Sequence, residues 1–157
     1  MSETIAGPLV VAVADLPKHV GKTLGPSPWI TVDQAMIDKF ADATGDHQWI
    51  HVDPARAKRE LPWGKTIAHG YLTLSLLPRL IKSLLEVRYR HALNYGSNKV
   101  RYTGMVPSGS RICLHQTLKA ADPERNEGIR LTSECKIMVD GHDKPALIAE
   151  VLAIFYP

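Results

Sequence analysis

Apolar residues recur at a helical spacing in the first half of the chain. Between residues 32 and 41 they follow a 3.6-residue period, at Val32, Met36, Ile37, Phe40 and Ala41. Thr31 or Asp33 can cap this predicted helix, and Gly45 favours the left-handed turn that ends a helix. The residues after Gly45 are therefore predicted to begin a loop.

Two further helices are predicted downstream. Asp53 and Pro54 are typical of a helix N-terminus, so residues 46–52 are predicted to form a loop between two helices. The stretch 69–87 is apolar on nearly every side, which predicts a helix enclosed by the rest of the protein. Pro78 predicts a kink or a break within it.

Towards the C-terminus the spacing becomes strand-like, with four strand candidates at 94–106, 110–119, 129–139 and 146–155. In the third, apolar residues alternate with Thr132, Glu134 and Lys136, which predicts one buried face. Short, turn-like links predict that sequential strands pair antiparallel. The order of elements predicts an α+β fold in which one apolar helix packs on an antiparallel sheet.

Length and composition fit one globular domain. The 157 residues are 45% apolar and 22% charged, which predicts a single domain over residues 1–157. Proline and glycine interrupt the N-terminal part so often that we expect residues 1–25 to be a peripheral segment of short elements. The net charge of +3 suits an anionic small ligand but is too small to favour nucleic acid.

The sequence predicts neither a membrane segment nor a disulfide framework. The longest apolar run, residues 9–14, is far shorter than the roughly 20 residues that cross a bilayer. No basic stretch precedes an apolar one at the N-terminus, so we expect a cytoplasmic protein with no membrane partner. Cys113 and Cys135 lie in strand-like stretches and are predicted to be small core residues.

Asp46 and His51 are the first candidates for chemistry. They lie five residues apart in the predicted loop, which can turn both side chains towards one water. Such a pair can transfer protons, because histidine titrates near neutrality and a carboxylate can hold its tautomer. The alternatives are a turn-forming role for Asp46 and a surface position for His51.

The same segment allows a metal site as a second interpretation. His47 and His51 are four residues apart, and Asp46, Asp53 and His69 could add ligands. However, a loop does not align two histidines as a helix does, and neither H-E-x-x-H nor a cysteine-rich spacing is present. We therefore expect no metal and no cofactor.

His69 and Gly70 stand before the enclosed helix. A glycine at a helix start leaves its backbone N–H open to a ligand, and the helix N-terminus favours negative charge there, as on an oxyanion. The alternatives are that Gly70 only relieves crowding and that His69 is a packed core residue.

Lys99 and Arg101 alternate along a predicted strand and could meet phosphates, although a solvent-facing strand surface explains them as well. The chain contains no G-x-S-x-G elbow, no phosphate-binding loop and no dinucleotide-binding glycine pattern. Nucleophilic hydrolysis and dinucleotide chemistry therefore have no support.

These segments together resemble a known family. The sequence G-D-H-Q-W-I-H at 45–51, followed by I-A-H-G-Y at 67–71, is similar to that of the MaoC-like (R)-specific enoyl-CoA hydratases of the hot-dog fold. The stretches 94–102 and 106–112 resemble the branch of this family named after nodulation protein N. The resemblance covers roughly residues 25–157.

The resemblance implies an antiparallel sheet wrapped around a long central helix, usually in a homodimer. It implies hydration of a trans-2-enoyl-CoA to a (3R)-3-hydroxyacyl-CoA. Asp46 and His51 would hold and activate the water, and Gly70 would donate its N–H to the thioester oxygen. Four further residues are expected to bind the acyl-CoA substrate: His69, Tyr71, Lys99 and Arg101.

Two positions depart from the better-known members of the family. Those members have Asn-Pro where this chain has Gln48-Trp49, and some have a serine where the helix here carries Pro78, with Ser75 nearby. Three other functions stay open: a hot-dog thioesterase, a dehydratase of a carrier-bound 3-hydroxyacyl chain, and a non-catalytic acyl-thioester-binding protein.

Overall fold

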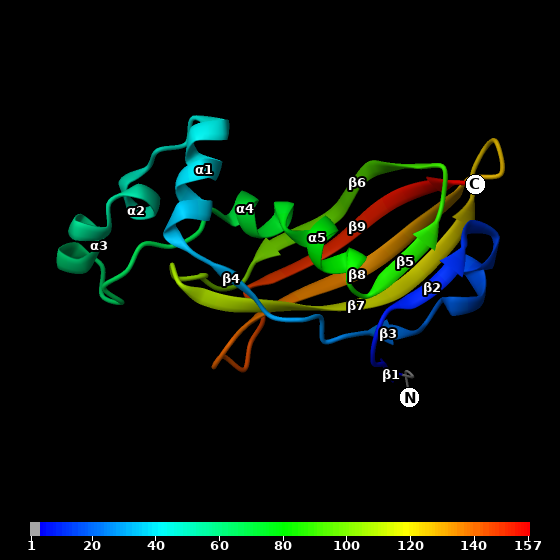
Figure 1. Cartoon of the computed structure of the whole chain (residues 1–157), viewed down its shortest axis with the longest axis horizontal. Coiled ribbons are helices and arrows are strands. Elements are labelled where there is room, and N and C mark those ends of the chain that lie inside the picture. The colour runs from blue at the N-terminus through cyan, green and yellow to red at the C-terminus, as the bar shows by residue number, and fades with distance from the viewer. Residues whose placement is uncertain (1–3) are drawn as a thin grey trace.

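The computed structural model describes residues 4–157, and its centre is one curved sheet (Figure 1). The strands of this sheet are β1 (Thr4–Ile5), β3 (Thr23–Leu24), β4 (Ile30–Val32), β6 (His91–Tyr102), β7 (Ser110–Pro123), β8 (Ile129–Val139) and β9 (Leu147–Tyr156). They follow the order β1-β3-β7-β8-β9-β6, with β4 also paired to β7. The β1–β3 pair is parallel, and the long strands pair antiparallel.

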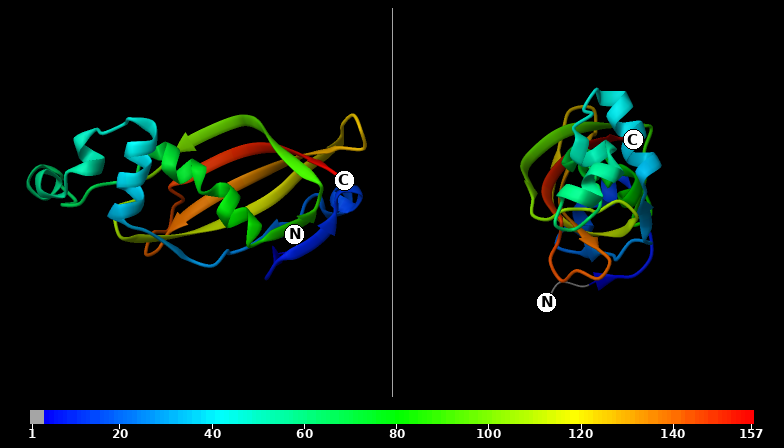
Figure 2. Two further views of the ribbon diagram at one scale, coloured as in Figure 1. Left: turned by 45° about the horizontal axis from the view of Figure 1, so that its top comes forward. Right: turned by 90° about the vertical axis from the view of Figure 1, so that its left-hand side faces the viewer.

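Two short helices, α4 (Gly70–Ser75) and α5 (Leu77–Lys82), lie against one face of the sheet, which curves around them (Figure 2). This arrangement confirms the predicted hot-dog fold and the break predicted by Pro78, but the helical stretch ends at Lys82 and does not extend to residue 87. The helix breaks at Leu76, and Pro78 lies in the first turn of α5, where its missing N–H costs no helical hydrogen bond. The end of the stretch forms strand β5 (Leu85–Arg88), which pairs in parallel with β2 (Leu9–Ala12).

Three helices form a lobe at one end of the sheet: α1 (Gln34–Thr44), α2 (Trp49–Val52) and α3 (Pro54–Glu60) (Figure 1). The Asp33 carboxylate caps α1 by accepting from Met36 N at 2.9 Å, and Gly45 ends the helix with a φ of 78°. Asp53 likewise caps α3. Both helix starts were predicted, whereas the short helix α2 lies within the predicted loop.

The core lies between α4–α5 and the sheet. The predicted face of β8 is buried, since five alternate side chains are at most 3% exposed: Leu131, Ser133, Cys135, Ile137 and Val139. Both cysteines are buried and free, as expected of small core residues. Burial raises the pKa of the Cys135 thiol to about 12, so this thiol stays protonated.

Residues 4–25 lie at the edge of the sheet and contain only short elements, including the 3₁₀ helix η1 (Val13–His19). Several of their apolar side chains nevertheless belong to the core, since Leu16 and Leu24 are completely buried.

Strand β6 pairs with β9 and not with β7, which corrects the expectation that sequential strands pair throughout. The link after β6 does not turn back on it. Thr103 N donates to Ala146 O, and Pro107 then forms a bridge with Ile67, so the chain crosses to the far side of the sheet. β6 is consequently an edge strand. Within residues 4–157, no helix has the length and apolar character needed to traverse a membrane.

Candidate active site

The site is formed where two segments of the chain meet, one around residues 46–52 and the other around 66–70. Ile67 N donates to Ile50 O at 3.1 Å, and Ala68 N donates to Val106 O at 2.8 Å. These backbone hydrogen bonds place the segment before α4 against the helical turn of α2.

His51 is buried, with 7% of its surface exposed, and its tautomer is set by one contact. Its Nδ1 lies 2.7 Å from Ile67 O. Because a carbonyl oxygen only accepts, Nδ1 carries the proton in the neutral ring and Nε2 keeps a lone pair. Burial lowers the pKa of His51, an effect that His69 reinforces and that the bond to Ile67 and the Asp46 charge oppose. The lowered pKa favours the neutral ring of His51 at neutral pH, with the lone pair on Nε2.

Asp46 directly follows the left-handed Gly45, which turns the chain out of α1. Its Oδ1 accepts from Gln48 N at 3.3 Å, and its side chain is 53% exposed. Single oxygen and nitrogen atoms of Asp46, His51 and His69 all lie within 4.8 Å of one another. The turn thus brings the carboxylate to the His51 ring and keeps it open to solvent.

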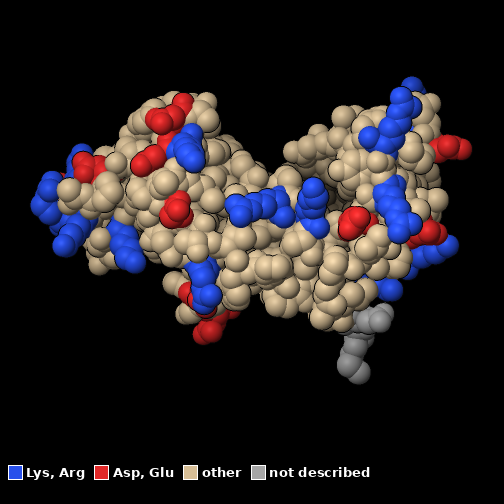
Figure 3. All heavy atoms as spheres, viewed as in Figure 1, with Lys and Arg blue, Asp and Glu red and all other residues tan. Residues whose placement is uncertain are grey.

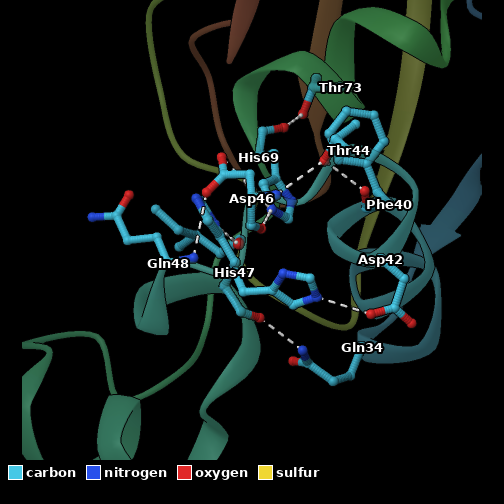
Figure 4. Close-up of polar contacts among 11 residues, drawn as sticks. Gln34, Phe40, Asp42, Thr44, Asp46, His47, Gln48, His69 and Thr73 are labelled. Atoms are coloured by element: carbon cyan, nitrogen blue, oxygen red, sulfur yellow. Dashed lines mark hydrogen bonds and ion pairs between the residues drawn. The ribbon is translucent and has the colours of Figure 1, made fainter.

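His69 is enclosed and is 2% exposed. Its ring stacks on that of His51, with the centroids 3.8 Å apart, and lies 5.0 Å from the Phe40 ring. Its Nε2 donates to the backbone oxygen of Asp46 at 2.9 Å (Figure 4). In this structure His69 contacts the two candidate catalytic residues, while its expected role in substrate binding stays a prediction.

Gly70 is the first residue of α4, so its N–H has no acceptor within the helix. A Cβ built on Gly70 would lie 3.0 Å from the Tyr102 ring, and the Tyr71 and Tyr102 rings meet edge to face at 6.1 Å. Tyr71 is 69% exposed. Tyr102 therefore covers the start of α4. The one signal of this in the sequence is that Tyr102 lies two residues after the apolar Val100 in a predicted strand, and so on the same face of that strand.

Sequence reasoning also missed a pair of residues that hold the two segments together. Gln34, at the start of α1, donates from Nε2 to His51 O at 2.7 Å and accepts at Oε1 from the hydroxyl of the buried Thr66. Gln34 is 17 residues from His51 and 32 from Thr66, and no spacing pattern links residues so far apart.

Lys99 and Arg101 lie on the other side of the sheet. Directly opposed residues of antiparallel strands share a face, and Lys99 faces Glu150 while Arg101 faces Ile148. The intervening Val100 faces the fully buried Ala149 on the helix side. The structure thus does not bring these two side chains to Asp46 and His51 within one chain, and their part in substrate binding stays a prediction.

Asp46, His51 and His69 are the one group in residues 4–157 whose ligand atoms gather closely enough for a metal ion. However, the two imidazole rings are stacked with 24° between their planes. An imidazole lone pair lies in the plane of the ring, and two stacked rings share no plane at coordination distance, so an ion could not lie in the planes of both rings at once. One nitrogen of each ring is already hydrogen-bonded to a carbonyl. The arrangement suits a bound water better than a metal.

The chain's departures from the better-known family pattern have visible consequences. Gln48 precedes α2, and its N–H donates to the Asp46 carboxylate. The Ser75 hydroxyl donates to Tyr71 O at 2.6 Å within its own helix. The Thr73 hydroxyl, also on α4, donates instead to His69 O, so its described hydrogen bond is to a residue of the site.

The structure thus places a carboxylate and an imidazole, two groups that can transfer protons, together beside the central helices of a hot-dog fold. Residues 15–133 match the model of the MaoC-like domain family. The chain is 46% identical to 3-hydroxyacyl-thioester dehydratase Z of Mycobacterium tuberculosis H37Rv, over 88% of this chain and 92% of the relative. It is 42% identical to nodulation protein N of Rhizobium leguminosarum, over 92% of this chain and 91% of that protein.

The chain therefore belongs to the MaoC-like domain family, as its sequence motifs predict. A solved R-hydratase from Pseudomonas aeruginosa has the same fold, with a TM-score of 0.67 at 20% identity, over 88% of this chain and 81% of that one.

Proposed function

We propose that this protein is a hydro-lyase that adds water reversibly to a trans-2-enoyl thioester, giving a (3R)-3-hydroxyacyl thioester. The observation that carries the proposal is the approach of Asp46 to His51, a neutral base whose Nδ1 proton is held by Ile67. A relative at 46% identity is named as a 3-hydroxyacyl-thioester dehydratase, which describes the same reaction in reverse.

In the proposed hydration, one water bridges the Asp46 carboxylate and His51 Nε2. Nε2 takes a proton from the water as the water oxygen bonds to the β-carbon. The electrons of the C=C bond move into the thioester as an enolate, and the imidazolium then returns its proton to the α-carbon. One water is thereby added, and Asp46 orients it and stabilises the transient positive charge on His51.

In the same proposal, the Gly70 N–H donates to the thioester oxygen. Negative charge develops on this oxygen in the enolate, and an unpaired amide at a helix N-terminus stabilises such charge without moving. Gly70 directly follows His69, whose ring stacks on that of His51, so the donor belongs to the same segment as the site.

We propose coenzyme A as the thioester carrier, in a cytoplasmic enzyme. Lys and Arg side chains gather at the end of the molecule formed by α3, which follows directly after His51 in the sequence (Figure 3). Lys58 and Arg59 are both exposed there. Exposed basic groups on the helix that follows the site segment in the sequence favour the anionic phosphates of coenzyme A.

We further propose a homodimer that forms through β6. This strand ends the sheet, and it carries Leu93 and Tyr95 with 52% and 61% of their surfaces exposed. Since a long edge strand with apolar side chains is a template for pairing, a second copy would satisfy it. Light scattering after gel filtration should give a dimer, and Leu93→Lys with Tyr95→Lys should give monomers, while Val10→Lys on β2 should not. A monomeric wild-type protein would contradict this proposal.

The direct test of the reaction follows the absorbance of crotonyl-CoA, which falls as the double bond is hydrated. We expect turnover, without release of free thiol, and formation of the 3R product by chiral analysis. Thiol release at the rate of substrate loss would instead identify a thioesterase. Binding of several enoyl-CoA chain lengths without turnover of any of them would identify an acyl-thioester-binding protein.

A further inference from the structure

We propose that His69 is a positioning residue that holds Asp46 and His51 in one geometry, rather than a group that contacts the substrate; its effect on catalysis rests on the proposed function. The side chain is 2% exposed and lies between the His51 and Phe40 rings. A ring so enclosed has almost no surface to offer a ligand, but it contacts both residues of the proton-transfer pair.

His69 makes one half of a reciprocal connection between the two segments of the site. His51, from the first segment, donates its Nδ1–H to Ile67 O of the second segment at 2.7 Å. His69, from the second segment, donates its Nε2–H to Asp46 O of the first at 2.9 Å. Each segment therefore anchors the other through an imidazole, and the two rings stack between the anchors.

The connection fixes the backbone of Asp46, a residue that has few other constraints. Its side chain is half exposed, and its own N–H makes only a long contact of 3.4 Å to the Thr44 hydroxyl. Because the left-handed Gly45 ends α1, Asp46 lies outside any helix and is not held by helical hydrogen bonds. The His69 hydrogen bond holds the Asp46 carbonyl (Figure 4). From this backbone position, one carboxylate oxygen of Asp46 lies within 4.8 Å of a ring nitrogen of His51.

The second ring nitrogen of His69 makes no competing hydrogen bond, which supports a positioning role through Nε2. His69 Nδ1 is buried and has no hydrogen-bond partner among residues 4–157. The hydrogen bond from Nε2 to Asp46 O is therefore the one hydrogen bond that the His69 ring makes among the described residues. The His69 carbonyl is also held, by Thr73 N at 3.1 Å, so the ring is attached to the first turn of α4.

Two substitutions separate the stacking from the hydrogen bond. His69→Phe keeps a ring of similar size against His51 but removes the donor to Asp46. His69→Gln gives up the ring, while its amide nitrogen can occupy the place of Nε2 and donate to the same carbonyl. His47 lies in the same segment, is exposed and pairs with Asp42 (Figure 4), so His47→Phe and His47→Gln are the matched controls.

We expect His69→Phe to lower kcat for crotonyl-CoA hydration about 100-fold, with KM changed less than about threefold, because displacing one reacting group by about 1 Å can cost that much. His69→Gln should recover about tenfold of the loss in kcat. Both His47 variants should behave as wild type. A rise in KM at unchanged kcat would show that His69 binds substrate, and wild-type kcat in His69→Phe would show that it positions nothing; either result overturns the inference.

Amide hydrogen exchange tests the inference without any activity. His69→Phe should exchange faster than wild type in residues 46–52 and equally in β7–β9, and His69→Gln should lie between the two. Unchanged exchange in 46–52 in a folded His69→Phe protein would overturn the inference even if the protein proved not to be a hydratase. If His69→Phe does not fold, the exchange and kcat of His69→Gln, compared with His47→Gln, decide the question by the same criteria.

Discussion

The sheet with its central helix and the segment 46–52 are held in place by different kinds of interaction. Long antiparallel ladders join β7, β8 and β9, and their inner side chains are almost completely buried. The segment 46–52 is instead held by the backbone bond from Ile67 N to Ile50 O and by single side-chain-to-backbone hydrogen bonds from Gln34, His51 and His69. The first region is stabilised by many weak contacts, the second by a few specific ones.

This difference separates stability from chemistry. A core side chain contributes to the free energy of unfolding in proportion to the apolar surface it buries. A side chain of the site contributes little buried apolar surface, but it fixes a geometry on which proton transfer depends. Substitutions in the two regions should therefore change different measurements, and variants of each kind can test this.

The largest effect is expected from Asp46 and His51, the proposed proton-transfer pair. His51→Gln and Asp46→Asn should each lower kcat for crotonyl-CoA hydration by about 10³-fold. The Gln amide cannot take up a proton as an imidazole does, and the Asn amide carries no negative charge. His47→Gln is the control on the same segment. Wild-type activity in both Asp46→Asn and His51→Gln would contradict the assigned roles.

A core substitution should have the opposite profile. Ile137 is completely buried in β8, so Ile137→Ala should lower the free energy of unfolding by about 2–5 kcal/mol, measured by urea denaturation. The kcat of the protein that remains folded should stay within about twofold of wild type. If kcat fell far more than that, the two regions would be coupled more tightly than the contacts indicate.

Gly70 belongs to both regions, because it is the first residue of α4 and the proposed donor to the substrate. Gly70→Ala keeps the backbone N–H but places a Cβ 3.0 Å from the Tyr102 ring, so we expect roughly a tenfold loss of kcat/KM from the displaced ring or helix start. Adding Tyr102→Ala removes the obstacle, and the double variant should be more active than Gly70→Ala alone. Simple addition of the two single effects in this cycle would argue against the contact as the cause.

The smallest effect expected is a difference in pKa between two histidines of one segment. Burial holds the pKa of His51 below the ordinary value of about 6.5, and the hydrogen bond to Asp42 raises that of His47. A titration followed by NMR of the ring protons should therefore give two midpoints on either side of that value. Because the base must be neutral, activity should persist as the pH falls to the lowered pKa of His51 and decline only below it.

Removing Asp46 should shift this titration further. The Asp46 charge raises the pKa of His51, so the midpoint of His51 in Asp46→Asn should move to a lower pH than in the wild type. A shift to higher pH would show that the carboxylate does not act on the His51 ring.

Local signals predicted most of the elements correctly. The caps at Asp33 and Asp53 and the helix end at Gly45 depend on residues within a few positions of one another, so the sequence displays them. The strand β8 has the predicted bounds, because its alternation of apolar and polar residues is regular. The break at Leu76 was harder to place, since proline fits the first turn of a new helix as well as it kinks an old one.

The candidate site was only partly visible in the sequence. The spacing of Asp46 and His51 in one short segment predicted that they could meet, and the structure brings their polar atoms within 4.8 Å. The places of Lys99 and Arg101 depended on which face of β6 turns towards the helix. That face is decided by the pairing of β6 with β9, a strand about 50 residues further along, and local alternation is the same for either choice.

The amino-acid sequence by itself determined the ends of α1, the start of α3, the alternation of β8 and which residues can carry a proton, because these properties arise from neighbours along the chain. The tertiary structure alone decided that β6 is an edge strand, that Tyr102 covers Gly70, and that His69 contacts both Asp46 and His51. These contacts join residues tens of positions apart, and they form only once burial of the core has fixed the distances between segments.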